Sequence, residues 1–108
     1  RRREAHRAEA IIEEEVQEFQ GWLAARGAVP TIAALRQRAE RIRQDELARS
    51  ASLLARLPEA DRRRVEALTL ALEKKLLHAP IALLRAEAAS GTGRSADRAL
   101  RQLFALDS

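Results

Sequence analysis

The chain has two histidines, the residue type used most often as a general acid or base, and they lie far apart. His78 occurs in the stretch KLLHAPIALLR, residues 75–85, and His6 precedes it by 72 positions. A catalytic base needs a nucleophile or an orienting carboxylate within hydrogen-bonding reach, and a metal ion needs several ligands together. Neither set surrounds His78. We therefore predict that His78 lies near the end of a helix, where its side chain can bond the last carbonyl groups.

Acidic residues near the N-terminus could in principle form a carboxylate pair or a metal site. Glu9 and Glu13 follow His6 at helical spacing, and the acidic run continues through Glu15 to Glu18. Consecutive residues point about 100° apart on a helix, which favours a solvated, ion-paired face over paired catalytic carboxylates. Glu15 and Glu18 are flanked by large apolar residues, so they could meet arginines of a partner helix.

The remaining residues that could take part in chemistry lack their partners. Gly91-Thr92-Gly93 resembles half of a phosphate loop, without the third glycine, the lysine or a preceding strand. None of the five serines has a histidine at a suitable spacing, and there is no cysteine. We predict no catalytic, cofactor-binding or metal-binding residue in this chain.

The basic residues suggest a different function. The chain has 20 basic and 16 acidic residues, a net charge of +4, and 18 of the basic residues are arginine. Phosphate groups of a nucleic acid could bind such residues, although no aromatic residues alternate with them for base stacking. A solvated, ion-paired face is the competing interpretation. The candidate contacts are Arg36, Arg38, Arg41, Arg43, Arg62, Arg63 and Arg64.

The elements that carry these residues should all be helices, because alanine, leucine, glutamate and arginine dominate and only eight residues are Val or Ile. Apolar spacing predicts a helix over about 3–26, ended by Gly27, and a second from Pro30 or Thr31 to about 57. A third should begin after Pro58 and break at His78-Ala79-Pro80. Two short helices should follow. The first should cover about 80–89. The second should be capped by Ser95 and should point Leu100, Leu103, Phe104 and Leu106 inward.

These helices are too long for a compact monomer. Two helices of about 25 residues would each be near 40 Å long, whereas a compact chain of this length has a radius of gyration of about 13 Å. The first and third helices also carry two apolar stripes each. We therefore expect an all-α helical bundle, with two long and two to three shorter helices, that is dimeric. Which stripe faces the second copy stays open; the candidate interface residues are Ile11, Ile12, Val16, Phe19, Trp22, Leu70, Leu72, Leu76 and Leu77.

Three stretches together resemble one family. They are AEAIIEEEVQEFQGWLAARGAVPTIAALRQRAERIRQDEL (residues 8–47), ALTLALEKKLLHAPIALLR (67–85) and LRQLFALD (100–107). As a set they are similar to the C-terminal dimerisation domain of glutamyl-tRNA reductase, and the resemblance covers essentially all 108 residues. We take the chain, which contains no methionine, to be an excised piece of a longer protein or a processed one.

The resemblance implies a function beyond what the residues themselves indicate. Members of this family reduce glutamyl-tRNA to glutamate-1-semialdehyde with NADPH, an entry step to tetrapyrroles such as haem. The parent is a V-shaped homodimer in which a spinal helix joins the catalytic and NADPH-binding domains to the dimerisation domain. Residues 1–108 would be that single dimerisation domain, and residues 1–26 the end of the spinal helix.

The expected partners follow from the same resemblance. The fragment would bind no cofactor and catalyse nothing, and its partner would be a second copy of itself. The alternative is a basic helical module that contacts tRNA through the arginines named above. No apolar run is long enough to cross a membrane, and we expect a cytoplasmic protein.

Overall fold

The computed structural model describes residues 2–91 and 93–107, except for the side chains of residues 2, 3, 20, 21 and 23–26. Four helices make up this part of the chain: α1 Arg2–Arg49, α2 Ala51–Ala55, α3 Glu59–Ser90 and α4 Ser95–Leu103. The predicted all-α class is therefore confirmed. Two of these helices are long and two are short, but the long ones are not those expected from the sequence.

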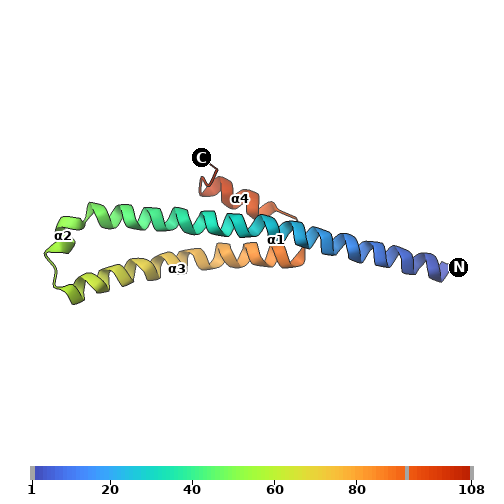
Figure 1. Ribbon diagram of the computed structural model, residues 1–108, viewed down its shortest axis with the longest axis horizontal. Coiled ribbons are helices and arrows are strands. Elements are labelled where there is room, and N and C mark those ends of the chain that lie inside the picture. Colours follow the sequence, from blue (N-terminus) through green and yellow to red (C-terminus); the bar gives the residue numbers. More distant parts are fainter. Residues whose placement is uncertain (1, 92, 108) are drawn as a thin grey trace.

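The predicted helix boundary at Gly27 and Pro30 is wrong, because α1 passes through both residues without a break (Figure 1). A proline inside a helix removes one hydrogen bond and costs roughly 3 kcal/mol. Tertiary packing offsets this cost directly beside the proline, where Ala28, Thr31 and Leu35 are buried. Gly27 also has a role other than ending the helix. The Arg94 guanidinium lies so close that a Cβ at residue 27 would meet its Nη2 at 1.9 Å.

The predicted break at His78-Ala79-Pro80 is wrong for the same reason. Pro80 lies inside α3, and the buried side chains of Leu77, Ile81 and Leu84 hold the helix on both sides of it. His78 is therefore an exposed residue in a helix interior and not a residue near a helix end. The expected start of a helix after Pro58 is confirmed, with Glu59 and Asp61 in the first turn of α3.

The last helix begins where it was expected but is capped differently. Ser95 is its first residue, and its N-cap position is Arg94, which makes no side-chain cap. Glu87 of α3 takes that role, because its Oε2 accepts hydrogen bonds from the Ala96 backbone N–H at 2.9 Å and from the Ser95 hydroxyl at 3.3 Å. Of the four residues expected inside, Leu100 is buried and Leu106 partly buried, whereas Leu103 and Phe104 are exposed.

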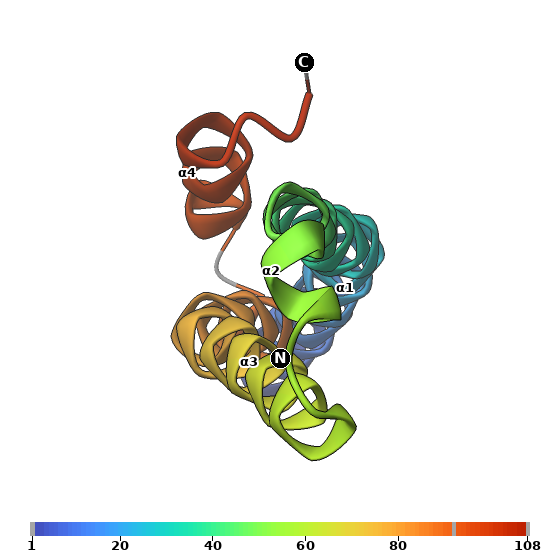
Figure 2. The same cartoon turned by 90° about the vertical axis from the view of Figure 1, so that its left-hand side faces the viewer.

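The helices form a hairpin with one long arm. The second half of α1 runs beside α3, the two are joined through α2, and α4 packs near the open end of the hairpin (Figures 1 and 2). The first half of α1 continues beyond the hairpin alone; residues 4–22 are named here the α1 extension. The principal extents are 81 × 28 × 14 Å and the radius of gyration is 21.3 Å, far above the value of about 13 Å for a compact chain.

Two small clusters hold the hairpin and α4 together. Leu35 of α1 packs against Leu77 and Ile81 of α3, and Leu84 of α3 packs against Ala96 and Leu100 of α4. Thr31 is fully buried beside them; its hydroxyl lies 3.2 Å from the Gly27 carbonyl oxygen and makes a short contact with Asp97 Oδ1 of α4. None of the helices described is long and apolar enough to cross a membrane.

Candidate dimerisation surface

The predicted interface residues lie mostly on the surface of a single copy. Leu77 is an exception: it is only 7 % exposed and packs in the hairpin core, and its contact with a partner stays a prediction. The other eight are exposed on two regions, the α1 extension and the middle of α3. They are Ile11, Ile12, Val16, Phe19, Trp22, Leu70, Leu72 and Leu76.

The α1 extension is an acidic helix with uncovered apolar side chains. Ile12 is 60 % exposed, Phe19 58 % and Trp22 52 %, and the rings of Phe19 and Trp22 stack with centroids 5.9 Å apart. Residues 4–19 carry six glutamates against one arginine. A surface of this kind is typical of a site that another protein surface covers.

A second uncovered region is an apolar groove between α1, α2 and α3 towards the closed end of the hairpin. Its volume is about 520 Å³. Ile42 of α1 and Leu72 and Leu76 of α3 line it and are more than half exposed. Leu53 of α2 and Phe104, just after α4, lie at its edges. We call this region the apolar groove.

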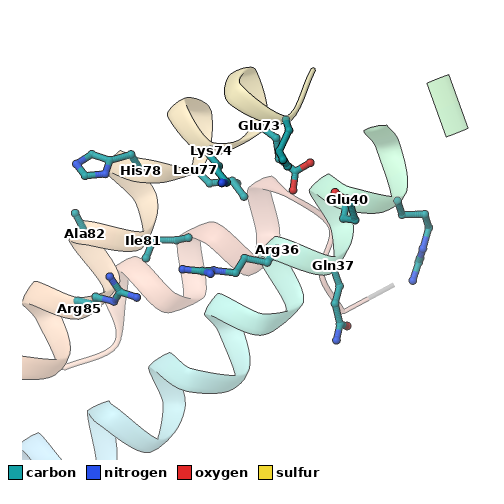
Figure 3. A pocket seen from close by; sticks show the side chains of 12 residues that line it. Arg36, Gln37, Glu40, Glu73, Lys74, Leu77, His78, Ile81, Ala82 and Arg85 are labelled. Atoms are coloured by element: carbon teal, nitrogen blue, oxygen red, sulfur yellow. The ribbon is translucent and has the colours of Figure 1, made fainter. Parts of the chain in front are cut away.

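A third region, here the basic groove, runs along the hairpin between α1 and α3 and has a volume of about 780 Å³ (Figure 3). Leu70, Leu77 and Ile81 line it from α3. Four cationic side chains line it as well, and none of the four is in any of the ion pairs found among the described residues. These are Arg36 and Arg41 of α1 and Lys74 and Arg85 of α3.

The two carboxylates of this groove are held by a different arginine. Arg43 Nη2 donates to Glu40 Oε1 at 2.5 Å and its Nε to Glu40 Oε2 at 2.9 Å. Glu73 Oε2 lies 3.2 Å from Arg43 Nε, but Nε–H is directed at Glu40, so this buried oxygen accepts no hydrogen bond. The hydrogen bonds from Arg43 and Gln44 lower the pKa of Glu40 to about 2. Burial, and then the neighbouring Glu40, raise the pKa of Glu73.

The raised pKa of Glu73 makes a prediction about pH. Stability that comes from a group with a raised pKa is present below its ordinary value of 4.5 and is lost as the pH rises through the raised one. Glu73→Gln removes this loss, so its melting temperature at pH 7 should be at least that of the unchanged chain, and the gap should close below pH 4.5. Thermal melts across this pH range at one protein concentration test it. Glu9→Gln, an exposed control, should show no such convergence; a large loss of stability in Glu73→Gln at pH 7 would contradict the prediction.

The arginines predicted to bind phosphate are dispersed. Arg36 and Arg41 line the basic groove, while Arg38 lines the apolar groove. Arg43 is paired as described above, and Arg63 pairs with Glu59 at 2.8 Å. Arg62 and Arg64 lie in the first two turns of α3. Their contact with tRNA stays a prediction.

The site holds features that sequence reasoning missed. Among the described residues, no three His, Asp or Glu side chains gather closely enough to hold a metal ion. In the stretch Gly91-Thr92-Gly93, which resembles half of a phosphate loop, Thr92 lies outside the part of the chain that the structure describes. The basic groove was missed because Arg36 and Arg85 are far apart in sequence. Only a correct pairing of α1 with α3 could have revealed it.

Comparison with known proteins identifies the family of the chain. The family model "Glutamyl-tRNAGlu reductase, dimerisation domain" matches residues 7–106. Relatives named glutamyl-tRNA reductase include one from Syntrophobacter fumaroxidans, 50% identical over 104 residues, which are 96% of this chain and 21% of that protein. Another, from Roseiflexus sp. strain RS-1, is 48% identical over 104 residues, 96% of this chain and 24% of its own length.

A third, from Syntrophotalea carbinolica, is 42% identical over 107 residues, 99% of this chain and 24% of that relative. The chain thus spans only about a fifth to a quarter of these relatives. No solved structure matches the chain significantly. The match over nearly all its residues shows that the chain belongs to the glutamyl-tRNA reductase dimerisation domain family.

Proposed function

We propose that residues 1–108 are a homodimerisation domain and that they pair two copies of a glutamyl-tRNA reductase. The observation that supports this most directly is the α1 extension, whose large apolar side chains stay half exposed in a single copy. Covering apolar surface is worth about 25 cal/mol per Å², so a second copy could gain free energy here and along α3. The proposed contacts are the eight exposed residues Ile11, Ile12, Val16, Phe19, Trp22, Leu70, Leu72 and Leu76.

The activity of the parent is part of the same proposal. The parent would reduce glutamyl-tRNA to glutamate-1-semialdehyde with NADPH, for tetrapyrrole synthesis, using residues outside this chain. Residues 1–26 would be the end of the spinal helix that joins the dimerisation domain to the rest. A cytoplasmic location and contact with tRNA stay predictions.

Molar mass in solution tests the dimer. The chain should have a mass of about twice 12.1 kDa at micromolar concentration. Sedimentation equilibrium or light scattering is the suitable measurement, because a monomer 81 Å long would elute early from a sizing column and imitate a dimer. A mass of 12.1 kDa at tens of micromolar would overturn the proposal.

A further inference from the structure

The basic groove and the α1 extension have opposite charges and similar apolar content. The groove offers Leu70 and Ile81 together with four cations that are in none of the ion pairs between described residues. The extension offers six glutamates with isoleucine, valine and aromatic side chains. Neither surface is covered within one copy. Phosphates alone would satisfy the cations but not the leucine and isoleucine, whereas an acidic amphipathic helix satisfies both.

The continuity of α1 decides which way each surface faces. Five turns of an α-helix contain 18 residues, so residues 18 apart point in the same direction. Glu18, Phe19 and Trp22 are therefore in phase with Arg36, Gln37 and Glu40, three of the four α1 residues that line the basic groove. The acidic, apolar face of the extension and the basic groove consequently lie along one side of one helix.

The same phase argues against the apolar groove as the site for the extension in a symmetric pair. The α1 residues of that groove are Arg38, Ala39, Ile42, Arg43, Glu46 and Leu47, and of the exposed apolar side chains of the extension only Ile11, 36 residues before Leu47, is in phase with any of them. Ile12, Val16, Phe19 and Trp22 are not in phase with these groove residues. In a pair related by a two-fold axis each helix uses one side for both contacts, which leaves the basic groove as the receptor.

The lengths also fit. The midpoint of α1 divides it into residues 2–25, which include the extension, and residues 26–49, which belong to the hairpin; each half contains 24 residues, roughly 36 Å. Two α1 helices laid antiparallel about their midpoints place each extension beside the hairpin of the other copy. The groove lies about 10 to 15 residues beyond the midpoint, and Ile11 to Glu18 lie about as far before it. Both contacts then form twice in a closed dimer.

We propose, building on the homodimer proposed above, that the α1 extension of each copy docks in the basic groove of the other, antiparallel, with Glu15 and Glu18 facing the groove arginines. The occupant of the groove is thus a second copy of this chain. His78 lines the same groove and would lie at this contact.

Charge exchange between two variants tests the proposal. The extension variant is Glu15→Arg with Glu18→Arg, and the groove variant is Arg36→Glu with Arg85→Glu. Each should weaken dimerisation at low salt tenfold or more in Kd, because like charges meet at both contacts. An equimolar mixture should recover near the original Kd, because a heterodimer matches an arginine extension with an acidic groove and an acidic extension with a basic groove.

Matched controls separate this effect from general charge. Glu9→Arg with Glu13→Arg changes the far side of the extension, and Arg56→Glu with Arg64→Glu changes exposed arginines near the closed end of the hairpin. Both should dimerise as the unchanged chain does. Circular dichroism establishes that every variant is helical, and sedimentation of the mixture measures the recovery.

The outcomes distinguish this proposal from the one on which it rests. An unchanged chain that is monomeric overturns both. A dimeric unchanged chain with variants of undiminished Kd, or with defective variants that fail to recover on mixing, overturns only the docking arrangement. If the groove variant dimerises normally but loses low-salt binding of unfractionated tRNA, the groove serves phosphate groups instead and the arrangement is again overturned.

Discussion

Leu35→Ala is expected to lower the free energy of unfolding by about 3 kcal/mol, a large fraction of the stability of a small domain. Leu35 is fully buried, and its side chain joins α1 to Leu77 and Ile81 of α3. The hairpin has few other buried residues, so the cavity cannot be filled by repacking a large core. Urea denaturation followed by circular dichroism measures the loss, at one fixed protein concentration because dimerisation contributes to apparent stability.

Leu83→Ala is the matched control, because Leu83 is 55 % exposed and lies on the outer side of α3. It removes the same atoms from a surface that is not buried within one copy. We expect a change of no more than about 0.5 kcal/mol. Equal losses for the two variants would contradict the assignment of Leu35 to the core that joins the hairpin.

Thr31→Val is expected to lower the free energy of unfolding by about 1–3 kcal/mol, mainly by weakening the packing of α4 on the hairpin. Valine keeps the shape of threonine but cannot bond Asp97, the link between α1 and α4. The Asp97 carboxylate would keep only its contact with Arg101, at 3.7 Å. Hydrogen exchange should show α4 amides losing protection more than the amides of the α1–α3 hairpin.

Thr31→Ser separates the hydroxyl from the methyl group. Serine retains the hydroxyl and should preserve most of the protection of α4, with a small loss from the missing methyl group. If serine and valine destabilise α4 equally, the hydroxyl contributes nothing and packing alone holds the helix.

The helical class and the exposed apolar stripes could be predicted because they depend on local spacing. Pro58 was correctly taken as a boundary, since the chain turns there before α3. Pro30 and Pro80 were not boundaries. A proline's local preference is the same at all three positions. What differs is that buried residues lie on both sides of Pro30 and of Pro80, whereas none of residues 59–68, which follow Pro58, is buried. That packing is visible only once α1 and α3 are placed together.

In the candidate site, too, features that depend on one helix could be predicted, and features that join two helices could not. Eight of the nine proposed contact residues are exposed in a single copy, because a second apolar stripe on a helix is visible in its own sequence. Leu77 is buried in a single copy, which the sequence did not indicate because both stripes of α3 are leucine-rich and spacing does not say which one faces α1. The capping of α4 by Glu87 and the fourfold cationic lining of the basic groove join residues of different helices. Such pairs leave no periodic signal.

The stacked rings of Phe19 and Trp22 on the α1 extension provide an intrinsic fluorescence signal for that part of the chain. Trp22 is the single tryptophan and there is no tyrosine, so the indole fluorescence of this protein comes from one place only. That place is on the extension, beside Phe19, outside the hairpin. Emission wavelength and accessibility to a quencher therefore follow what happens to the extension, while circular dichroism follows the helices as a whole. Two optical signals from the unlabelled chain can thus separate the covering of this arm from the folding of the hairpin.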